Sequence, residues 1–150
     1  MKGAPWMLGL MAALVLAAGT AHAWLGFGKY AAVEPENGRV VIPADDVSDG
    51  AAHYYHYKKD GRDVKFFVLK SSDGVIRAAF DACDVCWREG KGYSQEGDFM
   101  VCNNCGQRFH SARINEVRGG CNPAPLDRAV EHGDVVISEA DILAGAGYFR

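Results

Sequence analysis

The sequence predicts a mainly β fold with metal-binding loops and one short helix near its C-terminus. Three observations support this. Short runs of β-branched and aromatic residues alternate with tight-turn signals from residue 39 onward. The same region lacks the sustained 3.6-residue periodicity of a long amphipathic helix. Four cysteines, arranged as two C-x-x-C pairs, lie between the predicted strands. The length of 150 residues favours one domain.

Residues 1–23 are typical of a secretory signal peptide. Lys2 supplies the positive charge, an apolar run follows, and Ala21-His22-Ala23 forms a small-x-small cleavage site. The apolar run is shorter than the ~20 residues of a membrane span. We therefore predict Sec-type export to the periplasm or another extracytoplasmic space. An uncleaved segment that anchors the chain to the membrane is the alternative, and residues 24–37 are interpreted as a linker or arm.

The predicted domain, residues 38–150, begins with strands. We expect strands at 39–42, 52–58, 63–70 and 75–80, and the last three form a meander. Asp60-Gly61 indicates a tight hairpin turn, since both residues accept positive φ angles. Further strands are expected at 99–101 and 134–137. The predicted core side chains are Phe66, Val68, Val75, Ile76, Phe80, Val135 and Ile137.

A short helix is expected to begin after Ser138. Ser138 is a suitable N-cap, Asp141 completes a capping box, and Gly145 ends the helix.

The charge balance excludes one class of partner. The net charge is −3, and removing the single positive charge of Lys2 with the signal leaves −4. No block of Lys or Arg is present, so nucleic acid is not an expected partner.

Cys83, Cys86, Cys102 and Cys105 are the predicted metal ligands. Two C-x2-C pairs separated by fifteen residues supply four thiolates, which suit a tetrahedral zinc or iron ion or an iron–sulfur cluster. Gly106 permits a tight turn with backbone N–H groups facing sulfur. Disulfides are the alternative in an exported chain, although five cysteines would leave one unpaired. Haem attachment is not expected, because neither pair is followed by His.

Cys121 and His110 are candidates for an additional ligand, and Cys121 is also a candidate redox thiol. The alternative for Cys121 is a buried free cysteine or a disulfide with a partner. We find no paired carboxylates, no Ser/His/Asp set and no phosphate loop. We therefore expect an electron carrier rather than an enzyme.

The run FDACDVCWREGKGYSQEGDFMVCNNCGQRFHSARINEVRGGCNPAPL, residues 80–126, resembles the FtrD-like membrane iron–sulfur protein family. The motifs that carry the resemblance are Asp81-Ala82-Cys83, Gly92-Tyr93, Cys102-Asn103-Asn104-Cys105-Gly106 and Gly119-Gly120-Cys121-Asn122-Pro123. The resemblance extends over about residues 38–149. It implies an iron–sulfur cluster and a redox role in iron uptake, with a redox partner protein or a membrane iron permease system as partner.

The ligand loops are also similar to those of Rieske domains, which implies a small Rieske-like β-sandwich or barrel. Both histidine positions of the Rieske pattern are cysteines here. All-cysteine ligation of a [2Fe–2S] cluster, the cofactor that we favour, predicts a potential of about −400 mV.

A structural zinc- or copper-binding interaction module without redox role is the alternative function, and mononuclear iron is a further alternative cofactor. The same four thiolates accept all of these metals. In addition, no Arg-Arg pair precedes the apolar run to mark export of a folded, loaded chain.

Overall fold

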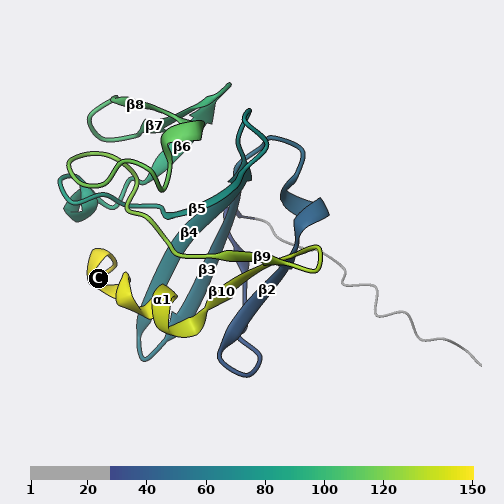
Figure 1. Ribbon diagram of the computed structural model, residues 1–150. Helices are drawn as coiled ribbons and strands as arrows, with labels where there is room; N and C mark the ends of the chain where they lie inside the picture. Colours follow the sequence, from purple (N-terminus) through teal and green to yellow (C-terminus); the bar gives the residue numbers. More distant parts are fainter. Residues whose placement is uncertain (1–27) are drawn as a thin grey trace, which may run out of the picture.

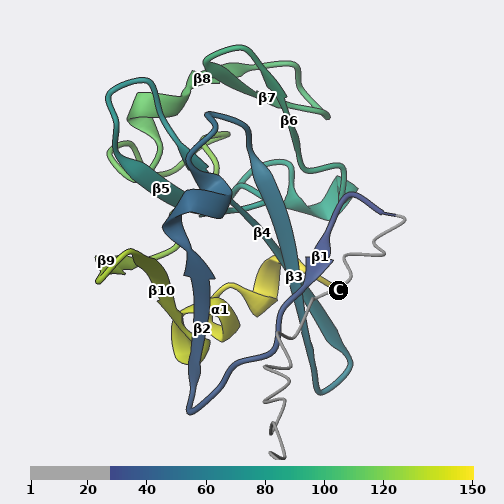
Figure 2. The same ribbon diagram turned by 90° about the vertical axis from the view of Figure 1, so that its right-hand side faces the viewer.

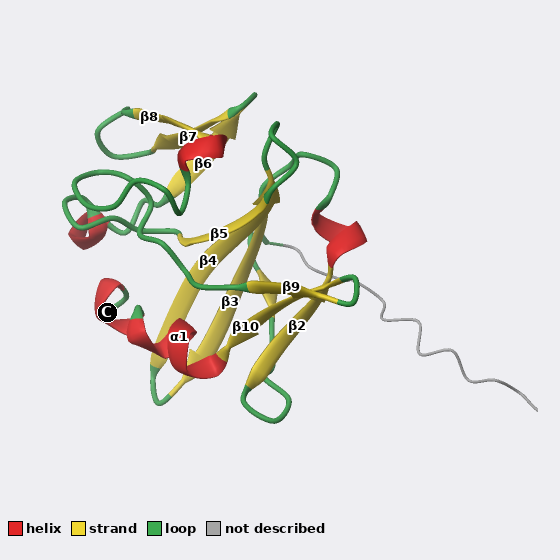
Figure 3. Ribbon diagram, in the orientation of Figure 1, coloured by secondary structure: helices red, strands yellow, loops and turns green. Residues whose placement is uncertain are grey.

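The computed structural model describes residues 28–150, and strands dominate that region (Figures 1 and 3). It contains three small sheets and one short α-helix near the C-terminus, which confirms the mainly β prediction. The predicted signal peptide lies outside the described residues. Within residues 28–150, no helix is both long enough and apolar enough to cross a membrane.

The central sheet has four strands in the order β1-β3-β4-β5. Strands β3 (His53–Lys59), β4 (Arg62–Lys70) and β5 (Ile76–Phe80) form the predicted antiparallel meander. The first hairpin turn has positive φ angles at Asp60 (49°) and Gly61 (75°), as its Asp-Gly sequence predicted. Strand β1 (Ala31–Ala32) pairs in parallel with β3 and belongs to the expected arm, residues 24–37.

Strand β4 is buried on both faces, and this divides the interior into two cores. Val64, Phe66 and Val68 point into the first core, whereas Phe67 and Leu69 point into the second. Alternation along a strand sends successive side chains to opposite faces, so one apolar strand supports a packing layer on each side.

The first core is closed by a second sheet and by the helix. This sheet has the order β2-β10-β9, with β2 (Arg39–Pro43), β10 (Asp134–Ser138) and β9 (Ala129–Glu131). The helix α1 (Glu139–Ala144) follows β10 directly, and the Ser138 side chain accepts a hydrogen bond of 3.0 Å from the Asp141 N–H, as the capping sequence predicted.

The second core lies under a third sheet, β6-β7-β8, at the end of the molecule away from α1 (Figure 2). Its strands are β6 (Tyr93–Glu96), β7 (Phe99–Cys102) and β8 (Arg108–His110). Met100 and Tyr93 of this sheet pack with Phe67 and Leu69 of β4. Cys83, Cys102 and Cys121 belong to this second core, and Cys86 packs against it.

Some details differ from the sequence prediction. Strands β1, β6, β8 and β9 were not predicted, because each is too short for its side chains to show a clear alternation. The prediction of Val75 as a core residue is wrong, since 41% of this residue is exposed. The Ser71–Val75 turn, closed by the Ser71 N–H to the Val75 carbonyl at 3.0 Å, delays the start of β5 to Ile76.

Two neighbouring valines on β2 provide a test of the first core. Val40 is 2% exposed and Val41 is 53% exposed, because they face opposite sides of the strand. We expect Val40→Ala to lower the free energy of unfolding by about 1–3 kcal/mol, through lost apolar burial and the cavity left behind. Val41→Ala, measured by the same urea titration, should change it by less than about 0.5 kcal/mol. Equal effects would contradict the register of β2.

Acid should weaken the turn that joins β4 to β5. Hydrogen bonds from Ser71, Arg77 and the Val75 N–H lower the pKa of Asp73 from 3.8 to about 2. A carboxyl group whose pKa is lower in the folded state stabilises the fold above its unfolded pKa, and the contribution is lost as the pH falls through the folded pKa. The stability advantage of wild type over Asp73→Asn should therefore be full above about pH 4 and shrink toward pH 2.

Asp98→Asn is the control for this acid titration. Asp98 is exposed, and among residues 28–150 its carboxylate has no hydrogen-bond partner. A pH-independent difference between wild type and Asp73→Asn would contradict the role of the Asp73 carboxylate.

Candidate metal centre

The first cysteine pair occupies the loop that leaves β5. Cys83 is buried and Cys86 is partly buried. The Cys86 N–H donates a hydrogen bond of 3.2 Å to the Cys83 sulfur, which is the local turn expected of a C-x-x-C pair. The chain then enters a short 3-10 helix, Trp87–Glu89, and turns back toward β6.

The second pair lies at the end of β7. Cys102 is the last residue of that strand and is buried, whereas Cys105 is exposed in the following turn. This turn is closed by the Gly106 N–H to the Cys102 carbonyl at 2.8 Å, with a φ of 75° at Gly106. The glycine therefore has the turn role that the sequence predicted.

Cys121 reaches the first pair through a long-range contact with β5. Its loop continues into residues 124–126, which lie along this strand: the Phe80 N–H donates to the Ala124 carbonyl at 2.8 Å, and the Ala124 N–H donates to the Ala82 carbonyl at 2.9 Å. Ala79 and Pro125 form an antiparallel bridge. These contacts fix the loop that carries Cys121 beside Cys83.

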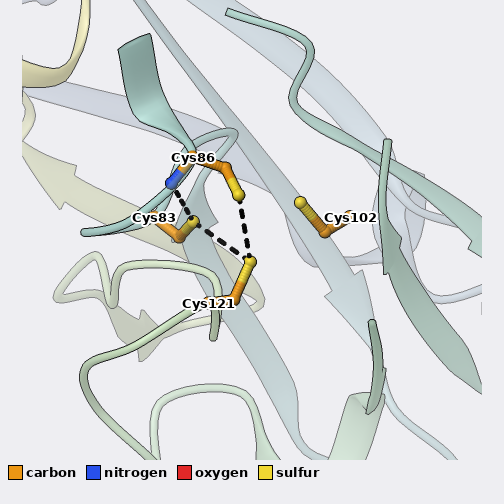
Figure 4. Close-up of side chains that lie close together, drawn as sticks. All are labelled: Cys83, Cys86, Cys102 and Cys121. Atoms are coloured by element: carbon orange, nitrogen blue, oxygen red, sulfur yellow. Dashed lines mark hydrogen bonds between the residues drawn. The ribbon is translucent and has the colours of Figure 1, made fainter. Parts of the chain in front are cut away.

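Four sulfurs form a compact group in the second core. The Sγ atoms of Cys83, Cys86, Cys102 and Cys121 all lie within 4.8 Å of one another (Figure 4). The Cys121 sulfur lies 3.5 Å from the sulfurs of both Cys83 and Cys86. It also lies 3.0 Å from the sulfur of Cys105, at the solvent-exposed edge of the group. All five thiols are free.

Tyr93 connects the three cysteine-bearing segments. Its N–H donates to the carboxylate of Asp81 at 2.6 Å, and Asp81 stands two residues before Cys83. Tyr93 pairs in register with Cys102 across β6 and β7. Its hydroxyl donates to the Cys121 carbonyl at 2.7 Å. Burial, followed by the neighbouring Cys83 thiol, raises the pKa of Tyr93, so the phenol keeps the proton that it donates.

Asp81 is a buried carboxylate that supports this arrangement. Its side chain is inaccessible to solvent and accepts hydrogen bonds from Lys29 at 2.8 Å and Tyr30 at 2.5 Å, in addition to the Tyr93 N–H. The sequence analysis quoted Asp81 only as part of a motif. A single acidic residue in the otherwise apolar run Ala78–Cys83 was the available signal, because a charge in a buried segment requires partners.

The thiols differ in acidity. Burial raises the pKa of Cys83, but hydrogen bonds from backbone N–H groups, that of Cys86 first, outweigh burial, and the net pKa lies below its usual value. Burial, followed by the surrounding thiols, raises the pKa of Cys121. The lowered pKa favours the thiolate form of Cys83, the form that binds metals.

His110 stands apart from the four-sulfur group. It is the last residue of β8, its ring packs edge-on against Phe99 at 5.2 Å, and its Nδ1 accepts a hydrogen bond of 3.2 Å from the Ala112 N–H. The His110 ring is therefore not part of the four-sulfur group.

The donor set has a clear chemical preference. Thiolates are soft ligands that suit iron–sulfur clusters, zinc and copper(I). Four convergent sulfurs match the number that such centres need. The number and type of donors thus fit an iron–sulfur cluster, as they fit a single thiophilic metal ion.

Fold and site together define a small β domain with a thiolate site able to hold a metal. The chain belongs to the FtrD-like family, described as "Membrane iron-sulfur containing protein FtrD-like", whose sequence pattern matches residues 47–149. This confirms the resemblance seen in the sequence. No curated protein matches the chain.

Among solved structures, the chain is similar to the quaternary ammonium Rieske monooxygenase CntA in complex with the inhibitor MMV12, with a TM-score of 0.44 and 15% identity. The match covers 64% of this chain and 29% of the monooxygenase chain.

Two glycines before β6 test the contact between Tyr93 and Asp81. Gly90 and Gly92 have nearly equal φ angles of 61° and 62°, but a Cβ atom on Gly92 would overlap the Asp81 carboxylate, whereas a Cβ atom on Gly90 would meet nothing within 4 Å. Both Ala substitutions carry the same left-handed strain of about 1–2 kcal/mol. We expect Gly92→Ala to lower the free energy of unfolding by a further ~1–3 kcal/mol, measured by denaturant titration. Equal losses would mean that the Asp81 carboxylate does not constrain this turn.

Proposed function

We propose that this protein is an exported iron–sulfur protein that transfers single electrons in support of iron uptake. One observation carries the proposal: four cysteine sulfurs from three separate segments converge within 4.8 Å. Membership of a family described as iron–sulfur containing supports the choice of cofactor.

The proposed ligands are Cys83, Cys86 and Cys102, together with a fourth cysteine. The spacing of the two pairs predicted Cys105 for this position. We propose Cys121 instead, because its sulfur belongs to the compact group and the residue is only 8% exposed. In this proposal Cys105 is a fifth thiol that borders the centre from the solvent side, 3.0 Å from Cys121.

A bound cluster supplies one-electron chemistry, and the surrounding residues would set its potential. The Cys86 N–H donates to the Cys83 sulfur, and hydrogen bonds to ligand sulfurs are a recognised determinant of cluster potential. Burial of Cys83, Cys102 and Cys121 keeps water away from most of the site. We propose an electron carrier rather than an enzyme.

The proposed location is extracytoplasmic, and the proposed partners are a redox protein or a membrane iron permease system. Support comes from the signal-like sequence of residues 1–23 and from the word "membrane" in the family description. We favour a [2Fe–2S] cluster because the sequence of the ligand loops resembles that of Rieske domains, and four thiolates would complete its coordination.

A structural zinc- or copper-binding interaction module is the second candidate function. The observation that favours it is the purely thiolate donor set, which zinc and copper(I) accept as readily as iron. Metal identity therefore separates the two functions.

The test is the iron, zinc, copper and acid-labile sulfide content of the full chain purified anaerobically from its native compartment. We expect two irons and two sulfides per chain. The visible absorption bands should bleach on reduction, because all-thiolate [2Fe–2S] clusters are reduced at about −400 mV. One zinc per chain and a colourless solution would overturn the electron-carrier proposal. Absence of metal with a single free thiol would mean that the pairs are disulfides.

Two single substitutions test the fourth ligand. Cys121→Ser should lose iron and sulfide. Its metal affinity should fall by more than the loss of about 10–100-fold that is typical when a residue next to a metal ligand is changed. Cys105→Ser, its matched control, should retain both. The opposite result would return the fourth position to Cys105 as the spacing predicted. Near-ultraviolet circular dichroism of each variant shows whether the fold is preserved.

A further inference from the structure

A cleft of about 550 Å³ opens beside the four-sulfur group. Cys83, Cys86 and Cys102 contribute to its lining. This volume lies in the range of small-molecule sites, about 300–1,000 Å³. An electron carrier needs only a surface through which its centre can be approached, so a cleft of this size next to the thiols requires a separate explanation.

The cleft has four basic side chains from three separate parts of the chain: Lys65 on β4, Arg88 and Lys91 in the segment between β5 and β6, and Arg150. Among residues 28–150, no carboxylate forms an ion pair within 4.0 Å of any of the four; the cations that do form such pairs, such as Lys29 and Arg77, are not among the lining residues. Four unpaired cations around one cavity are notable in a chain with a net charge of −3.

The acidic residues of the cleft are already engaged. Asp81 accepts hydrogen bonds from Lys29 and Tyr30, and Asp63 pairs with the His56 ring at 2.7 Å. The four basic side chains outnumber these two carboxylates, so the side chains that line the cleft give it an excess of positive charge.

Aromatic rings contact three of the four cations without cancelling their charge. The guanidinium groups of Arg88 and Arg150 lie 5.3 Å and 4.7 Å from the centre of the Trp87 ring. The Lys65 ammonium lies 5.2 Å from the centre of the Tyr30 ring. Cation–π contacts of this kind orient a positive group and leave its hydrogen-bond donors available.

We propose that this cleft binds a small polyvalent oxyanion, one that carries at least two carboxylate or phosphate groups. Guanidinium groups match the geometry of both kinds of oxyanion, and ammonium groups bind either as point charges. The cations enter the cleft from different elements, so an anion with several charged groups contacts more of them than a monovalent anion does. Such an anion lies directly beside Cys83, Cys86 and Cys102, and a metal that it chelates comes close to the proposed centre.

The test is isothermal titration calorimetry of the metal-free full chain with citrate, pyrophosphate and acetate at constant ionic strength. We expect saturable binding of one molecule of citrate or pyrophosphate, weaker binding of acetate, and loss of affinity as salt is added. The stronger of the two polyvalent anions identifies carboxylate or phosphate as the preferred group.

A pair of double variants with the same net charge locates the site. Arg88→Gln with Lys91→Gln should weaken binding about tenfold, as expected for the loss of two charge-assisted contacts. The control combines Lys70→Gln, at the last residue of β4, with Arg113→Gln; neither residue lines the cleft, and affinity should be retained.

Two results would overturn the proposal: absence of binding at millimolar anion, or equal weakening by both double variants. The first would leave the cations available for an acidic protein partner. The measurement uses metal-free protein, so its outcome is independent of the metal and sulfide content that tests the electron-carrier function.

Discussion

The thiol group depends on the position of Tyr93. One residue makes a backbone hydrogen bond to the segment before Cys83, pairs in register with Cys102, and donates its hydroxyl to the carbonyl of Cys121. The two hydrogen bonds join residues 12 and 28 positions apart, and the pairing joins two neighbouring strands. Because the side chain is fully buried, an alternative position would leave a phenol hydroxyl and a backbone N–H without partners, at a cost of about 1–3 kcal/mol each.

Residues near the beginning of the described chain help to hold Tyr93 in position through Asp81. Asp81 accepts the Tyr93 N–H and is itself held by Lys29 and Tyr30, which precede β1. A buried carboxylate is tolerated only when its oxygens have partners. The arm before β1 therefore takes part in positioning the first cysteine pair, although it is remote from it in sequence.

The central sheet has a purely structural core on one face and the core that holds the cysteines on the other. Strand β4 sends Phe66 into a core closed by β2, β10, β9 and α1, and it sends Phe67 into the core that holds the cysteines. The first core gives the sheet a rigid support. The second core can then carry buried thiols and a cleft with unpaired cations, two features that stabilise a fold poorly by themselves.

By itself, the sequence determined the meander, the Asp60-Gly61 hairpin, the capped helix α1 and the two C-x-x-C turns, because these features depend on periodicity, positive φ angles and capping groups within a few residues. Only the tertiary structure decided the burial of Asp81, the position of Tyr93 and the entry of Cys121 into the sulfur group. The pairing of residues 124–126 with β5 brings Cys121 beside Cys83. Such pairing joins residues about forty positions apart, and no local pattern records which sheet edge a loop will cover.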